Sequence, residues 1–242
     1  MSLYAFSFAL MIAGVLLCEA SEEDRKTVWD GVYTSAQAGR GEVAYGAECS
    51  QCHGEDLSGF SNALRGGAFM NKWREDNLGS LFTRVKSMPP SAPGSLGNGV
   101  YLDILAYILQ VNKFPSGTEE LKSDVLSRIQ VRAKGGPQPV PDFALVEVTG
   151  CLAKGESGTW RLIDAGEPVR TRNPSVSSLS ELKLAASQPS GDHTFRLLDT
   201  DNRQTGFNNG QKMKAKGFLI RKPEGDQINI TFLERVGPRC GE

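Results

Sequence analysis

Five consecutive residues, Cys49-Ser50-Gln51-Cys52-His53, carry the clearest chemical pattern in this chain of 242 residues. The CxxCH spacing lets two thiols add to the vinyl groups of one haem while the following imidazole ligates the iron. Thioether bonds formed in this way do not dissociate, so the haem becomes a permanent part of the chain. The pattern therefore predicts one haem c, covalently bound through Cys49 and Cys52, with His53 as an iron ligand.

Zinc sites and redox dithiols also use the CxxC spacing. A zinc site needs further ligands at paired spacings, whereas the remaining thiols and the second imidazole stand alone in the sequence, at Cys18, Cys151, Cys240 and His193. A redox dithiol is expected near the start of a helix in a βαβ pattern. The residues before Cys49 instead have the pattern of a helix that ends there, so haem attachment is favoured over both alternatives.

A methionine is the best candidate for the second iron ligand, because low-spin haem is ligated by imidazole or thioether groups. Met1 and Met11 lie in an apolar N-terminal stretch, which leaves Met70, Met88, Met213 and His193. Pro89 disfavours a helical conformation at Met88, and the following prolines stiffen residues 87–94. We expect this segment to hold Met88 against the iron, with Met70 and Met213 as packing residues and His193 as an ordinary surface or core residue.

Three helices are predicted around these ligands. The first covers residues 35–49, where Gly41 and Tyr45 lie four positions apart on one face. The second covers residues 77–86, with Asn77 as its N-cap and an amphipathic pattern formed by Leu78, Leu81, Phe82 and Val85. The third is strongly apolar, covers residues 98–111 and ends before Phe114-Pro115. The first helix ends at the CxxCH run, the second ends just before Met88, and the third packs against the other two.

Residues from about 29 to 111 resemble a class I cytochrome c domain. In that family the helix that ends in CxxCH crosses the last helix, and a glycine and an aromatic residue of the first meet an aromatic residue of the last. Gly41, Tyr45 and Tyr107 occupy these positions. The Met88-Pro89 segment and residues 103–109 are similar to modules that accompany periplasmic quinoprotein dehydrogenases. The resemblance implies an all-α haem domain that transfers single electrons.

The N-terminal residues predict export. Residues 3–17 are apolar apart from Ser7, and Cys18 and Ala20 form a small-x-small cleavage site, so residues 1–20 are expected to be a signal peptide. An uncleaved anchor or an acylated Cys18 are the alternatives, and only these would associate the chain with a membrane. Haem attachment outside the cytoplasm agrees with export, so we expect a periplasmic or otherwise exported protein.

Composition changes mark the domain boundaries. We expect the haem domain at residues 27–113, a linker with a short helical stretch at 114–141, and a second domain at 142–242. Short runs of β-branched and aromatic residues predict strands at 143–152, 159–163, 194–198, 213–221 and 228–233. They favour a small all-β barrel or sandwich, OB-like, with Gly150 and Gly217 at bends. The predicted fold class is α + β in separate domains, all-α followed by all-β.

The two remaining thiols, Cys151 and Cys240, both lie in the second domain. In an oxidising compartment they are expected to form a disulfide. Two separate buried thiols are the alternative.

Charge and motifs limit the function classes. A net charge of −1 does not favour nucleic acid as a partner, and no Ser-His-Asp, phosphate-loop or paired-carboxylate pattern rises above chance. We expect an electron carrier rather than an enzyme, which accepts electrons from a dehydrogenase or another donor and passes them to a downstream acceptor. The expected partner is a redox protein, either a dehydrogenase or a cytochrome or oxidase. An open sixth iron position would instead make it a gas sensor or a small peroxidase. A third reading is an electron-transfer subunit that joins a larger dehydrogenase complex through the β domain.

Overall fold

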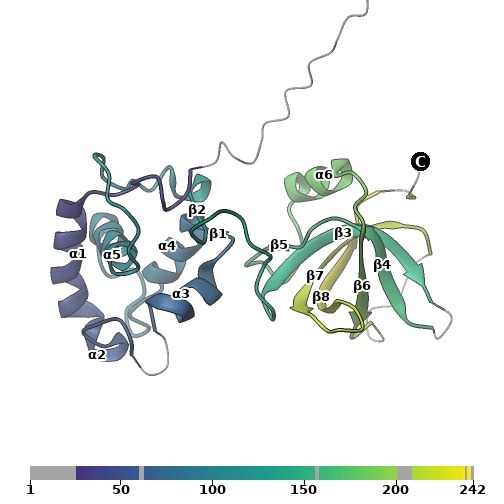
Figure 1. The fold of residues 1–242 in the computed structure, drawn as a ribbon, viewed down its shortest axis with the longest axis horizontal. Coiled ribbons are helices and arrows are strands. Elements are labelled where there is room, and N and C mark those ends of the chain that lie inside the picture. Colours follow the sequence, from purple (N-terminus) through teal and green to yellow (C-terminus); the bar gives the residue numbers. More distant parts are fainter. Residues whose placement is uncertain (1–25, 60–62, 156–157, 201–208, 238, 241–242) are drawn as a thin grey trace, which may run out of the picture.

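The computed structural model describes residues 26–59, 63–155, 158–200, 209–237 and 239–240. The predicted signal peptide, residues 1–20, lies outside this range. A region with helices α1 to α5 and a region with a β-barrel lie side by side (Figure 1), and each has a hydrophobic core of its own. In the described part of the chain no helix is both long enough and apolar enough to cross a membrane.

The first region contains α1 (Ser35–Glu48), α2 (Ser50–His53), α3 (Gly66–Trp73), α4 (Leu78–Lys86) and α5 (Asn98–Val111). Thr34 caps α1 by accepting a hydrogen bond from the Gln37 N–H at 3.1 Å. Asn77 caps α4 in the same way, since its Oδ1 accepts from the Ser80 N–H at 3.0 Å. The three helices predicted from the sequence are therefore present, nearly at the predicted bounds.

Helices α1 and α5 pack tightly at Gly41. A Cβ at this position would collide with the backbone carbonyl of Asp103 in α5, so only glycine allows this approach. One turn later the rings of Tyr45 and Tyr107 meet, with centroids 5.4 Å apart. The predicted contact between Tyr45 and Tyr107 is confirmed, while Gly41 meets Asp103 and Ile104 of α5, the same helix as Tyr107.

The chain that follows α5 also belongs to the first core. Leu121, Leu126 and Ile129 are each buried there, with Leu126 in the 3-10 helix η2 (Leu126–Arg128). Strand β2 (Gln130–Val131) then pairs antiparallel with β1 (Asp76–Asn77). The segment after α5 thus returns to the start of α4.

The second region is a closed barrel. Its strands are β3 (Leu145–Lys154), β4 (Trp160–Ala165), β6 (His193–Leu198), β7 (Lys212–Ile220) and β8 (Gln227–Arg235). They follow the order β4-β6-β8-β7-β3, and a β3–β4 pairing closes the ring. Only β6 and β8 run parallel among these pairs. Gly217 lies at a register shift of β7 against β8, which agrees with its predicted role at a bend.

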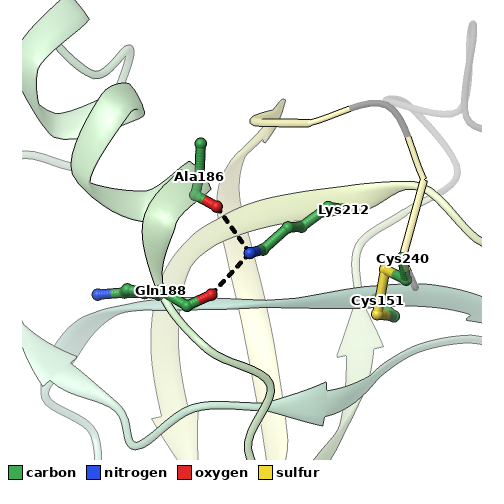
Figure 2. The surroundings of a disulfide bond; sticks show 5 residues. All are labelled: Cys151, Ala186, Gln188, Lys212 and Cys240. Carbon is green, nitrogen blue, oxygen red and sulfur yellow. Dashed lines mark hydrogen bonds between the residues drawn. A yellow bond between two sulfur atoms is a disulfide. The ribbon is translucent and has the colours of Figure 1, made fainter. Parts of the chain in front are cut away.

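Two further elements surround the barrel. Strand β5 (Val169–Arg170) pairs with the outer side of β3, and α6 (Leu179–Ser187) packs against β7. The Lys212 ammonium donates to the carbonyls of Ala186 and Gln188, at 2.8 and 2.7 Å, and so holds the end of α6 (Figure 2). Cys151 and Cys240 form a disulfide beside this contact, which confirms the predicted pairing.

The predicted fold class is wrong, because the chain does not divide into an all-α and an all-β part. The helical region contains the β1–β2 pair, and α6 covers the strand region, so the structure is mixed α/β with a closed five-stranded barrel. The β1–β2 pair joins two residues from each of two distant segments, which leaves no periodic signal. Helix α6 buries only Ala185, so it lacks a strong apolar stripe.

Candidate functional site

Cys49, Cys52 and His53 lie within one helical turn. The Cys49 N–H donates to the Tyr45 carbonyl at 2.9 Å and ends α1, and the His53 N–H donates to the Cys49 carbonyl at 3.0 Å and closes α2. Cys52 is exposed, whereas Cys49 and His53 are half-buried. Two thiols and an imidazole are thus held together at the end of a helix that is anchored on α5.

The two thiols of this turn do not form a disulfide. Burial, followed by the neighbouring charges of Glu48 and Cys52, raises the pKa of Cys49 to about 11. Redox dithiols need the opposite, since the attacking thiol of such enzymes has a lowered pKa. The surroundings of Cys49 therefore do not activate this thiol as a nucleophile.

The backbone around His53 is restrained by three contacts. The Tyr45 hydroxyl donates to the Gly54 carbonyl at 2.7 Å, and Gly54 adopts a φ of 77° that favours glycine. The Gly59 N–H donates to the His53 carbonyl at 2.7 Å. A Cβ at Gly59 would press against the His53 backbone, so these contacts fix the direction in which the chain leaves the CxxCH run.

Met88 comes from a second segment, directly after the C-cap of α4. Its N–H donates to the Val85 carbonyl at 3.0 Å, and its own carbonyl accepts from the Tyr101 hydroxyl at 2.9 Å. The same hydroxyl accepts from the Leu96 N–H at 3.4 Å. Tyr101, buried in α5, thus holds both ends of the proline-rich segment, while the Met88 side chain stays half-buried.

Tyr101 was not among the residues predicted to belong to the site. The signal was present, because Tyr101 shares a helical face with Ile104, Leu105 and Ile108, all of which are buried. What the pattern alone does not give is the partner of its hydroxyl, which lies on a different segment.

The other candidates for the second ligand have other roles. Met70 in α3 packs against the first core and Met213 is buried in the second, so the prediction that both are packing residues is confirmed. His193 begins β6, and its Nε2 lies 2.9 Å from Glu167 Oε1.

The donor set fits a c-type haem: two thiols and an imidazole in one turn, and a thioether on a segment held by α5. Leu64, Met70 and Leu96 pack against the first core and are only partly buried. A cleft of about 990 Å³ is lined by residues of the segments 26–32 and 118–130 and by none of the four predicted ligands. It is therefore not part of the candidate haem site.

Comparison of the chain with models of known protein families, with curated proteins and with solved structures gives no match. A function for this protein consequently has to be argued from its own residues and their geometry.

Proposed function

We propose that this protein is a one-electron carrier with a single haem c attached through Cys49 and Cys52 and ligated by His53 and Met88. The observation that carries the proposal is the single helical turn that holds both thiols and the imidazole at the end of α1. The resemblance of residues 29–111 to class I cytochrome c supports it, as does the contact of Gly41 and Tyr45 with α5.

When bound, a haem with these ligands supplies reversible Fe(III)/Fe(II) chemistry, and a thioether ligand favours the ferrous state and raises the potential. The chain's own part is to hold the group and its two axial side chains. Helix α1 fixes the thiols and His53 against α5, and Tyr101 fixes the Met88 segment against the same helix. Both ligand-bearing segments thus share α5 as a common support.

An exported location belongs to this proposal. The Cys151–Cys240 disulfide supports it, because such bonds persist in oxidising compartments. Redox proteins are the expected partners, with a dehydrogenase or another donor on one side and a downstream acceptor on the other. Cys52 is exposed, so the edge of a haem attached there would be accessible to a partner through a small, transient interface.

Optical spectra of the matured protein test the proposal. We expect the reduced protein to be low-spin and inert to carbon monoxide, and the oxidised protein to show the weak near-infrared band of a thioether-to-iron bond. Met88→Ala should lose this band, whereas Met70→Ala, a matched change at a packing methionine, should keep it. The haem should stay on the chain in denaturant unless Cys49 and Cys52 are both replaced.

A high-spin wild-type protein that binds carbon monoxide readily would contradict Met88 ligation. An open iron position of that kind would favour the gas-sensor or peroxidase alternative. A chain that matures without haem would overturn the proposal as a whole.

A further inference from the structure

Two arginines of the barrel region lie against the end of α3. Arg170, in β5, donates from Nη1 to the Lys72 carbonyl at 2.7 Å and from Nη2 to the Asn71 carbonyl at 3.1 Å. Arg172 donates from Nη2 to the same Lys72 carbonyl at 2.8 Å. The last carbonyls of a helix carry partial negative charge, so both guanidiniums are well placed there.

Arg172 makes two further contacts across the junction. Its guanidinium carbon lies 4.4 Å from the centroid of the Trp73 ring, a cation–π geometry. Its Nε donates to Asp76 Oδ2 at 2.6 Å. One side chain of the barrel region therefore contacts two positions at the end of α3, Lys72 and Trp73, and Asp76 in β1.

Asp76 connects Arg172 to the N-terminal end of α4. It is 5% exposed, and while Oδ2 accepts from Arg172, Oδ1 accepts from the Asn77 N–H at 2.8 Å. Asn77 is the N-cap of α4, the helix whose C-terminal end leads into Met88. A continuous chain of short contacts thus runs from Arg172 through Asp76 to the cap of the helix that delivers the proposed ligand.

The guanidinium groups of Arg170 and Arg172 place two positive charges close together. Burial, followed by the charge of Arg172, lowers the pKa of Arg170 to about 10. The carboxylate of Asp76 and the carbonyls of α3 offset this repulsion. Removing either Arg172 or Asp76 leaves a charge of the junction without its partner, so the pair is expected to respond as a unit.

We propose that Arg172 and Asp76 are positioning residues through which the barrel sets the place of α4 and, with it, of the Met88 side chain. The inference rests on the proposed function and gives the barrel a part in it. The bond between Met88 and the haem iron then depends on how the barrel packs against the helical region, although neither Arg172 nor Asp76 is itself an iron ligand.

The test uses the haem-loaded full chain with Arg172→Gln, Asp76→Asn and the double variant. Arg161→Gln, at an exposed arginine of β4, is the matched control. Near-infrared spectra and the midpoint potential measure whether Met88 ligates the iron. Small-angle scattering measures whether the helical region and the barrel keep their relative arrangement. We expect each single variant to lose part of the thioether band and to lower the potential. The double variant should lose no more than either single one, and the control should match wild type.

Arg172→Lys serves as a milder variant if the others do not fold. A lysine keeps the charge but not the planar fork that reaches Asp76 and the Lys72 carbonyl together, so an intermediate loss of the band is expected. Variants that loosen the seating but keep the wild-type band and potential would overturn the positioning role, and so would variants that change neither readout. A wild-type protein that carries haem without the band would refute Met88 ligation itself, a distinct result.

Discussion

Cys49 and Cys52 belong to one helical turn but have different surroundings, since Cys49 packs against the first core and Cys52 is exposed. The raised pKa of Cys49 means that this thiol is protonated at neutral pH. A protonated thiol reacts slowly with alkylating agents, because the thiolate is the nucleophile. The turn therefore holds the free Cys49 thiol in a form that reacts slowly with such agents.

The haem-free chain provides a test at the residue scale. Alkylation of Cys49 by iodoacetamide should rise with pH about a midpoint near 11, well above the ordinary thiol value of about 8.5. Timed alkylation followed by peptide mass spectrometry measures this midpoint. Denaturant should return it to the ordinary value, and a folded-state midpoint near or below the ordinary value would contradict the burial described above.

The donor residues were accessible to sequence reasoning because their signal is local. CxxCH is a contiguous run, and Met88 was selected by elimination together with the prolines beside it. Tyr101, Asp76 and Arg172 were not found, since what each does depends on a partner far away in the chain. The sequence thus predicts the candidate ligands but not the contacts that position them.

At the scale of elements, the crossing of α1 and α5 depends on Gly41. Gly41→Ala should destabilise the fold by about 1–3 kcal/mol, because the added methyl forces the two helices apart. Gly39→Ala is the matched control on the same helix, as nothing lies within 4 Å of its Cβ position. The control should instead stabilise by roughly 0.5–1 kcal/mol. Denaturant unfolding of both variants measures these changes in stability. Equal changes for Gly41→Ala and Gly39→Ala would contradict the close approach of α1 and α5 at Gly41.

Helix α6 begins with a capping box. The Ser178 hydroxyl accepts from the Glu181 N–H at 3.3 Å, and the Ser178 N–H donates to the Glu181 carboxylate at 2.6 Å. Ser178→Ala should cost about 1 kcal/mol, measured by denaturant unfolding. Ser187→Ala, at the other end of the helix, is expected to cost less.

The capping box also predicts a pH dependence. The hydrogen bond from the Ser178 N–H lowers the pKa of Glu181. A carboxyl whose pKa is lower in the folded state contributes stability that is fully present above its unfolded value, about 4.3, and is lost as the pH falls through the folded value. Glu181→Gln should remove this component, so that unfolding curves of variant and wild type converge in acid. Curves that stay parallel from neutral pH into acid would argue against it.

The elements differ in how well the sequence foretold them. The helix that ends at Cys49 and the helix capped by Asn77 have strong local signals, and the barrel strands alternate or carry β-branched runs. The β1–β2 pair and α6 were missed, for the reasons of length and weak patterning given above. Those two elements are what makes the fold mixed rather than divided, so the error in fold class comes from the least patterned parts of the chain.

For the whole molecule, the Cys151–Cys240 disulfide joins residues separated by 89 positions. A loop of this length is expected to contribute about 4–5 kcal/mol on the chain-entropy account. A Cys151→Ala, Cys240→Ala double variant should lower the midpoint of barrel unfolding in denaturant by a corresponding amount. Reduction of the wild-type protein should have the same effect and should not lower the double variant further; a full effect of reductant on that variant would contradict the assignment.

Strand β5 has a further consequence for self-association. Strand β3 pairs with β4, β5 and β7, and the other four barrel strands have two neighbours each. Strand β5 pairs with β3 alone, so of the six strands in this sheet it presents the open edge. Open edges invite pairing with other chains, and short strands with charged residues discourage it. Here the edge is two residues long, and its Arg170 is bound to the end of α3. The contact of the barrel with the helical region therefore covers part of this open edge, and loosening that contact is expected to raise the fraction of oligomers seen by size-exclusion chromatography.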